Sequence, residues 1–159
     1  MNFPIGHLRQ RLLDRYLEAV EEGLLAWAGL IGKEADAGKM PKMPGVALLL
    51  SAGGFSPPHG VGGPQRQMAI IEWTAFAGGQ DHRGTGKSGY AGARGGDYAL
   101  EMTMQIAEGF EMRASDDAPG FPIWIDRFAL WAMDQPAGKF VYEVALRHEW
   151  NFVEEGFDE

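Results

Sequence analysis

The sequence predicts an α+β fold, in which a mainly antiparallel sheet carries an N-terminal amphipathic helix and a second helix packed on it. Apolar residues recur at helical spacing near the N-terminus, and apolar and polar residues alternate around a turn in the last third of the chain. Many of the 23 glycines and 9 prolines cluster between these regions, which predicts long Gly/Pro-rich loops. We expect residues 1–153 to form a single domain and residues 154–159 to be an acidic, disordered tail.

The first element is predicted to be a helix over residues 7–31. Apolar residues recur there at steps of three and four with charged residues between them, as in an amphipathic helix. Pro4 suits the start of this helix, and Gly29 and Gly32 suit its end. The apolar stripe comprises Leu8, Leu12, Leu13, Tyr16, Leu17, Val20, Leu24 and Trp27. We expect the stripe to pack in the core, with a subunit interface as the alternative.

Two strands separated by a loop are predicted next. Residues 46–51 form a short apolar run between proline- and glycine-rich stretches, which favours a buried strand. Residues 68–76 contain β-branched and aromatic residues and precede further glycines, so they predict a second strand. Residues 52–64 are too rich in proline and glycine to be regular, and we expect them to form a loop.

The second half of the chain is predicted to contain a helix followed by a β-hairpin. Residues 98–113 fit both a strand and a helix by spacing, but their alanine, methionine, glutamate and glutamine content favours a helix. Residues 122–133 and 139–153 both read as strands, and the five-residue turn between them predicts a hairpin.

The glycine-rich stretch 78–96 contains a Gly-Lys-Ser tripeptide, residues 86–88, of the kind that binds nucleotide phosphates. A P-loop requires a glycine five positions before this tripeptide, and Asp81 stands there instead. The loop should also lead directly into a helix, whereas four glycines follow Ser88 within eight residues. The sequence therefore predicts a glycine-rich loop and no nucleotide site.

Other patterns that carry chemistry are missing from the sequence. The histidines, His7, His59, His82 and His148, lack metal-binding spacing. The serines Ser51, Ser56 and Ser88 do not lie in a nucleophile elbow. Cysteine is absent, so thiolate ligands and cysteine nucleophiles are excluded. We expect no catalytic, cofactor-binding or metal-binding residues, and not an enzyme.

The charge balance argues against general binding to DNA or to anionic membranes. The net charge is −8, and such binding depends on lysine and arginine. No apolar run approaches the roughly 20 residues of a membrane helix, so we expect no membrane partner. An acidic surface would instead let DNA pass without being held.

The two long loops are the predicted sites of contact with other chains. Residues 52–67 and 77–97 are long for loops in a small domain, and such loops are commonly functional or disordered. We expect them to become ordered against a neighbouring subunit, with simple disorder as the alternative. The candidate interface residues are Phe55, His82, Arg83, Lys87, Tyr90 and Arg94.

The predicted order of elements resembles the tail-terminator and neck-protein family of long-tailed bacteriophages, which includes tail protein U of phage lambda and relatives in Mu-like phages. That order is helix, two strands, glycine-rich segment, helix and C-terminal hairpin, and it covers residues 8–152. The residues that carry the resemblance are Gly138, Tyr142 and Trp150, in and beside the final aromatic strand "GKFVYEVALRHEW".

The resemblance implies a structural virion protein in the tail or neck, assembled in the host cytoplasm. Such a protein forms a homo-oligomer, a hexameric ring at the head-proximal end of the tail, which ends tube polymerisation and joins the tail to the head. Its partners are the tail tube protein and a head-tail connector or stopper protein, and DNA passes through its channel. Two alternatives remain: another tail or neck component (tube, connector or completion protein), and an enzyme that binds a small molecule with the Gly-rich loops.

Overall fold

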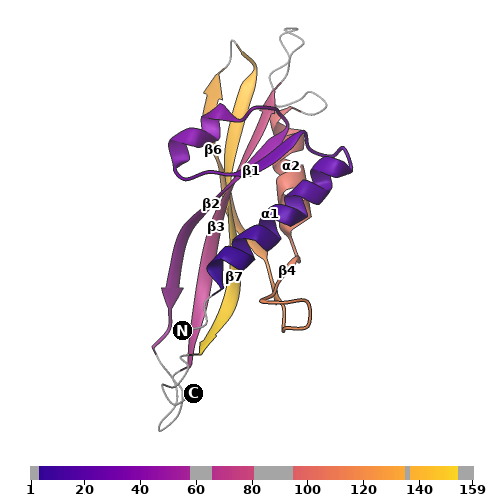
Figure 1. The fold of residues 1–159 in the computed structure, drawn as a ribbon. Helices are drawn as coiled ribbons and strands as arrows, with labels where there is room; N and C mark the ends of the chain where they lie inside the picture. Colours follow the sequence, from indigo (N-terminus) through magenta and orange to yellow (C-terminus); the bar gives the residue numbers. More distant parts are fainter. Residues whose placement is uncertain (1–3, 58–65, 81–94, 135–136, 154–159) are drawn as a thin grey trace.

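The computed structural model describes residues 4–57, 66–80, 95–134 and 137–153. Its main sheet has the strand order β1-β2-β3-β7-β6, in which β1 and β2 are parallel and all other neighbours are antiparallel. Along the chain the elements are α1 (Ile5–Glu21), β1 (Trp27–Leu30), η1 (Glu34–Lys39), β2 (Gly45–Phe55), β3 (Arg66–Gln80), α2 (Gly96–Ala107), β4 (Glu111–Met112), β5 (Phe121–Pro122), β6 (Trp124–Asp134) and β7 (Lys139–Val153). This arrangement confirms the predicted α+β class (Figure 1).

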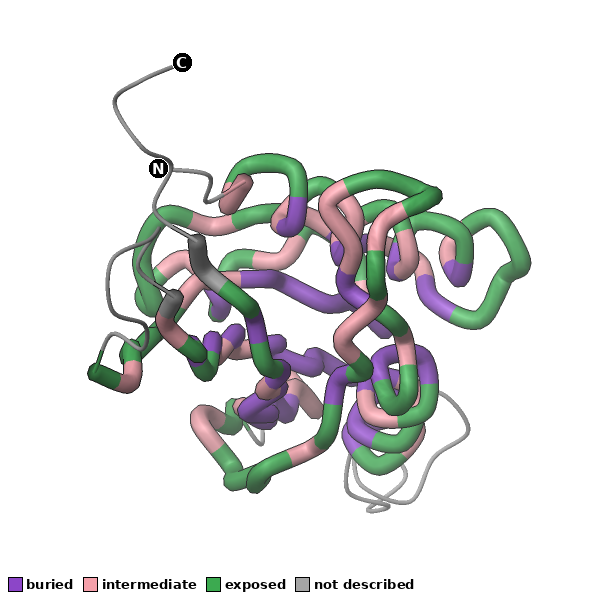
Figure 2. The backbone as a smooth tube through the Cα atoms, turned by 90° about the horizontal axis from the view of Figure 1, so that it is seen from below, coloured by how far each residue is buried: buried purple, intermediate pink, exposed green. Residues whose placement is uncertain are grey.

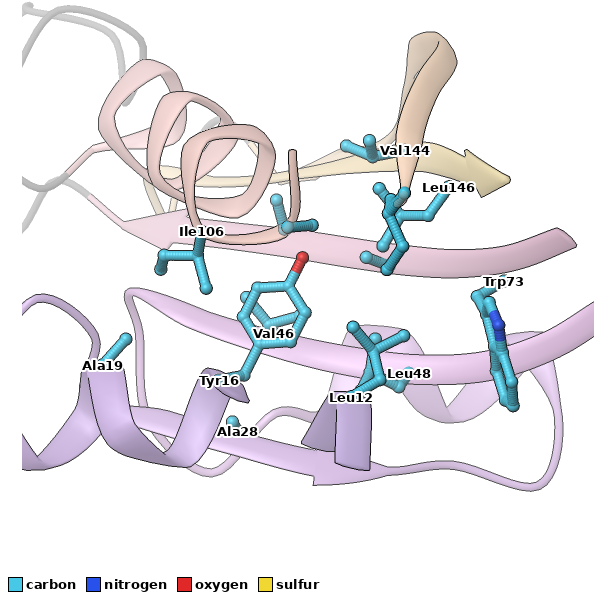
Figure 3. Close-up of a cluster of buried hydrophobic side chains, with 14 of the residues drawn as sticks. Leu12, Tyr16, Ala19, Ala28, Val46, Leu48, Trp73, Ile106, Val144 and Leu146 are labelled. Atoms are coloured by element: carbon cyan, nitrogen blue, oxygen red, sulfur yellow. The ribbon is translucent and has the colours of Figure 1, made fainter. Parts of the chain in front are cut away.

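Helix α1 packs against one face of the sheet through part of the predicted apolar stripe, whereas Leu17 and Leu24, also expected in the core, are exposed. Leu8, Leu12 and Tyr16 are fully buried, and Figure 3 shows Leu12 and Tyr16 directed towards Val46 and Leu48 of β2. The Tyr16 hydroxyl donates a hydrogen bond of 2.8 Å to the backbone carbonyl of Thr103 in α2. This bond satisfies a hydroxyl that has no access to water, and it joins the two helices across the core.

The prediction that the first helix continues to residue 31 was wrong, because α1 ends at Glu21. Gly23 has a φ of 80°, and its N–H donates to the carbonyl of Val20, while the next N–H, of Leu24, donates to Ala19. This is a Schellman C-cap, which glycine favours because it has no Cβ. The chain then enters β1, so Trp27 belongs to a strand although its spacing also fits the helical stripe.

Strands β2 and β3 are longer than predicted. Residues 52–55 and 77–80, which were expected to lie in loops, are paired strand. Pairing of β2 with β3 runs from Gly45↔Gly78 to Phe55↔Ala69 with one register shift after Leu50. Backbone hydrogen bonds to a neighbouring strand hold the glycines of these segments in an extended conformation. Local propensity cannot reveal such bonds, because they depend on a partner strand. Residues 66–67 and 96–97, also expected to lie in loops, belong to β3 and α2, whereas residues 58–65 and 81–94 lie outside the described residues.

The predicted second helix and the C-terminal hairpin are both present. Helix α2 ends at Ala107, before the predicted limit, where Gly109 takes a φ of 77° and the chain turns into β4. Strands β6 and β7 pair antiparallel from Asp134↔Lys139 outwards, as the turn predicted. The expected first strand of this hairpin is interrupted at Ile123, since Phe121–Pro122 pairs with β4 in a separate two-stranded sheet.

The two faces of the main sheet are covered to different extents. Both helices pack on one face, and Figure 2 shows buried positions on the inner sides of the helices and the sheet. The opposite face has a smaller core, formed where η1 brings Ala37 towards Phe76 and Val141. There the ring of Trp131 meets that of Phe76 edge to face, 5.2 Å between centroids. The remainder of this second face carries polar and charged side chains such as Glu72 and Arg147, together with the exposed apolar side chains of Met68 and Ile70.

Replacing Gly79 by alanine should destabilise the fold by about 1–3 kcal/mol, the usual cost of overpacking. A Cβ at this position would lie 2.3 Å from the backbone of Gly95, where the start of α2 meets β3. Gly53→Ala is the matched control in a strand, because its nearest atom would be 3.8 Å away. Urea denaturation measures both variants, and equal stability losses would contradict the close approach of α2.

Replacing Tyr16 by phenylalanine should lower the free energy of unfolding by about 1–3 kcal/mol, because the Thr103 carbonyl loses its buried donor. Tyr98→Phe is the matched control, since the Tyr98 hydroxyl donates to the Leu24 carbonyl at an exposed position. We expect the control to change stability by less than about 0.5 kcal/mol. Thermal and urea unfolding measure the stability of both variants. Equal stability losses would contradict the hydrogen bond from Tyr16 to Thr103.

Candidate functional site

Strand β6 forms one edge of the main sheet and exposes large apolar side chains. Phe128, Leu130 and Met133 are 55%, 43% and 52% exposed, and we call these three residues the β6 apolar row. They pair with Val144, Tyr142 and Phe140 of β7. Paired residues of antiparallel strands project from the same face, so the row extends the helix-covered face of the sheet beyond the helices.

Strand β6 carries part of the protection that edge strands usually have, because Asp126 and Arg127 lie on it and its pairing register shifts after Ile125 and after Leu130, but residues 128–133 carry no charge. Charged residues, proline or a covering segment normally keep an edge strand from pairing with another chain. In the described part of the chain, β6 has β7 on one side and no strand on the other. Its exposed apolar side chains therefore combine with an edge that is open to backbone pairing, which is typical of an interaction surface.

A second exposed apolar surface lies where β2 and β3 extend past the helices. We call residues 52–55 and 66–70 the hairpin arm, and it reaches beyond the helix layer at the bottom of Figure 1. Phe55, Met68 and Ile70 are exposed on it. Phe55 is one of the predicted interface residues, and an exposed position on an arm is compatible with that role. The other five, His82, Arg83, Lys87, Tyr90 and Arg94, lie outside the described residues and stay predictions.

An ionic cluster occupies the open face of the sheet. The Arg147 Nε lies 2.9 Å from Glu72 Oε1, Arg127 lies 3.3 Å from the same oxygen, and Asp126 lies 3.4 Å and 3.5 Å from the two guanidiniums. Burial alone would raise the pKa of the Glu72 carboxyl, but the hydrogen bond from Arg147 and the charge of Arg127 outweigh it and lower that pKa. Two carboxylates and two guanidiniums thus neutralise each other across three strands.

The ionic cluster is arranged to hold strands together and not to transfer protons. Glu72 and Arg147 stand directly opposite each other on β3 and β7, which is a stabilising cross-strand pair. Ser51 donates to the backbone carbonyl of Glu72 at 3.2 Å, and Thr74 donates to Ser51 at 2.9 Å. A carboxylate whose pKa is lowered by two cations is a weak base, so the cluster lacks the poised group that acid-base catalysis needs.

His148 is a structural residue of the core. Its Nε2 accepts a hydrogen bond of 2.9 Å from the indole N–H of Trp73, which requires the proton to be on Nδ1. That Nδ1–H donates to the backbone carbonyl of Glu149 at 2.8 Å. Burial lowers the pKa of His148, and the hydrogen bond to the backbone opposes it only in part. With both ring nitrogens engaged, His148 is not placed to bind a metal or to act as a base.

Comparison with known proteins leaves the chain's relationships open. The sequence matches no protein-family model, and no curated protein matches it at a significant level. Within the residues that the structure describes, no helix has the length and apolarity needed to cross a bilayer, and no three side chains of the metal-binding types come together.

The β6 apolar row was not among the residues predicted to be functional. Residues 122–133 were correctly assigned mainly to a strand, but alternation alone shows which side chains share a face and not whether anything covers that face. A usable signal was present, because Phe128 and Leu130 alternate with Ala129 and Trp131, so apolar residues occur on both faces. An edge strand that is apolar on both faces needs a cover on each.

The stability of the protein should fall as the pH is lowered from 7.5 to 5.5, in part because of His148. Its folded-state pKa lies below the value of 6.5 for an exposed histidine, so the unfolded chain binds more protons in this range. The contribution of His148 is present above the unfolded pKa and is lost as the pH falls towards the folded pKa.

The variant His148→Gln should be less stable overall and should show a weaker pH dependence over this range. His7→Gln is the control, because His7 is exposed on α1 and lies outside the core. Urea denaturation at several pH values measures both. If the two variants had the same pH profile, His148 would not be held neutral by burial.

Proposed function

We propose that this protein is a structural subunit that assembles with copies of itself, and that it serves as the tail terminator of a long-tailed bacteriophage. It forms a ring at the head-proximal end of the tail, ends tube polymerisation there and joins the tail to the head connector. The single observation that carries this proposal is the β6 apolar row on an open edge strand.

The energetics of the β6 apolar row favour several weak contacts in place of one strong contact. Complete burial of a side chain such as Phe, Leu or Met contributes about 1.5–3 kcal/mol. Since these side chains are about half exposed, covering them adds about 3–4 kcal/mol in all. Association of two proteins costs about 4–15 kcal/mol, so the row alone does not hold a dimer. A closed ring buries more surface than a dimer held by this row, because it has as many contacts as subunits.

The positions of the two apolar surfaces support a ring. The β6 apolar row lies along one edge of the sheet, whereas the hairpin arm extends from the β2–β3 end (Figure 1). Two different surfaces on one subunit favour a head-to-tail contact, in which one surface of each copy meets the other surface of the next. Head-to-tail contacts that close on themselves produce rings.

The acidic composition supports a channel through which DNA moves. With a net charge of −8, the protein does not hold phosphates by lysine and arginine contacts. The partners in this proposal are the tail tube protein on one side of the ring and a connector or stopper protein on the other. Tube, connector and completion proteins would use the same kinds of surface, and the partner that the ring caps distinguishes these roles.

Replacing Leu130 by serine should shift purified protein from rings towards single subunits of 17.4 kDa. We expect the association constant to fall at least tenfold, because the substitution removes apolar surface from the contact. Leu17→Ser is the matched control, since Leu17 of α1 is 37% exposed and Leu130 is 43% exposed. Light scattering and electron microscopy give the mass and the shape of the particles.

A wild-type protein that stays a single subunit at high concentration would contradict self-assembly. If rings form, adding them to polymerising tail tube protein should stop elongation and shorten the tubes. Rings that leave tube length unchanged would argue for a different tail or neck component.

A further inference from the structure

A groove opens where β1 stops and β2 continues. The parallel pairing of β1 with β2 ends at Leu30↔Leu48, although β2 runs on to Phe55. The last bond of this ladder is donated by the Ile31 N–H to the Leu48 carbonyl at 3.0 Å. Beyond that point the outer edge of β2 has no neighbouring strand in the described sheet, so the line of β1 is left open.

The groove is apolar and has one cation at its side. Its volume is about 480 Å³, and it is lined by Arg9, Leu30, Ile31, Gly32, Leu48, Leu49, Leu50 and Trp73. Leu30 is 43% exposed there. The guanidinium of Arg9 makes no ion pair with the residues that the structure describes. The groove thus suits an extended peptide that carries both an apolar side chain and negative charge.

We propose that this groove binds residues 154–159 of a second copy of the chain as an added strand. This segment reads Glu-Glu-Gly-Phe-Asp-Glu, with Phe157 as its one large apolar side chain. Phe157 enters the apolar part of the groove, and the acidic residues around it lie near Arg9. The inference rests on the proposed function, because it names a contact, besides that of the β6 apolar row, that links one subunit of the ring to the next.

The backbone of β2 is oriented to accept such a strand. The Leu48 carbonyl points to the outer edge, since it accepts from Ile31. The backbone groups of alternate residues in a strand point to the same edge, so those of Leu50 face the groove as well. Strand addition uses these backbone groups for affinity, and the pocket for an alternate side chain gives specificity.

The segment cannot reach the groove of its own subunit. Val153 pairs with Arg66 at one end of β3, whereas Leu50 in the groove pairs with Trp73. From position 66 to position 73 the strand rises about 23 Å, and crossing from β7 past β2 adds about 14 Å sideways, so the direct distance is about 27 Å. The stretch from Val153 to Phe157 spans at most about 14 Å. The occupant must therefore come from another copy.

This contact also accounts for a closed assembly. Each subunit has one such groove and one such segment, and Val153, from which the segment continues, lies away from the groove. A contact between different surfaces is head-to-tail, and it joins any number of subunits until the last groove receives the first segment. The negative segment and Arg9 add an attraction that salt weakens.

Cross-linking between copies tests the proposal directly, because the native chain has no cysteine. Leu30→Cys in a tagged copy and Asp158→Cys in an untagged copy, which keeps Phe157, should be joined by a short bis-maleimide into a mixed dimer. Leu24→Cys is the control, since Leu24 is 36% exposed but lines a different groove, between α1 and α2. A mixed dimer that forms equally well with the control would overturn the proposal.

Binding of a labelled peptide with the sequence of residues 152–159 gives a second measurement. The peptide should bind the variant that ends at residue 153, and Phe157→Ala in the peptide should weaken binding at least tenfold. Arg9→Glu in the protein should weaken binding in low salt, whereas Lys39→Glu, on an exposed residue of η1, should not. The proposal is wrong if the peptide does not bind, or if neither Phe157→Ala in the peptide nor Arg9→Glu in the protein weakens binding.

The oligomeric state separates failure of this contact from failure of the proposed function. If the full chain forms rings and the variant ending at residue 153 does not, the inference is supported. If both form rings, residues 154–159 are not the link, the inference fails and self-assembly stands. If neither assembles and the peptide does not bind, both proposals fail. A thermal shift on truncation at unchanged particle mass would place the segment in its own subunit, which also overturns the inference.

Discussion

The pairing of β3 with β7 is the constraint on which the rest of the structure depends. The two strands are paired without a register shift from Arg66↔Val153 to Gln80↔Lys139. Because side chains alternate along a strand, this one register sends Trp73 and the residues in phase with it to the helices. It sends Glu72 and Arg147 to the opposite face. Strands β2 and β6 then add on either side and inherit the same division.

The length of this central pair leaves surface uncovered. Fifteen residues of β7 extend about 50 Å, whereas the 17 residues of α1 span about 26 Å. A helix layer of that size covers the middle of the sheet and cannot reach the hairpin arm. It also leaves the β6 edge bare. The exposed surfaces of the sheet therefore follow from a mismatch between strand length and helix length.

The described polar groups on and beneath the sheet are mostly engaged with one another. The ionic cluster balances its own charges, and His148 has partners on both ring nitrogens. A reactive site keeps a group free for its substrate, whereas these groups join neighbouring strands. The exposed apolar side chains of β6 and the open groove beside β2 are therefore the features of the described chain that suit contact with another molecule.

The sequence by itself determined the kind of most of the long elements, since periodicity and composition depend only on neighbouring residues, but it assigned β1 to a helix. The spacing of Leu8, Leu12 and Tyr16 defined the first helix, and the alternation in residues 139–153 defined the hairpin. Tertiary structure decided where elements end, because Trp27 fits a helix or a strand until β2 supplies its partner. Tertiary structure also decided which apolar side chains are exposed. Phe55 was predicted as an interface residue and is exposed, but Phe128 and Leu130 were missed, because a pattern cannot show how far helices reach across a sheet.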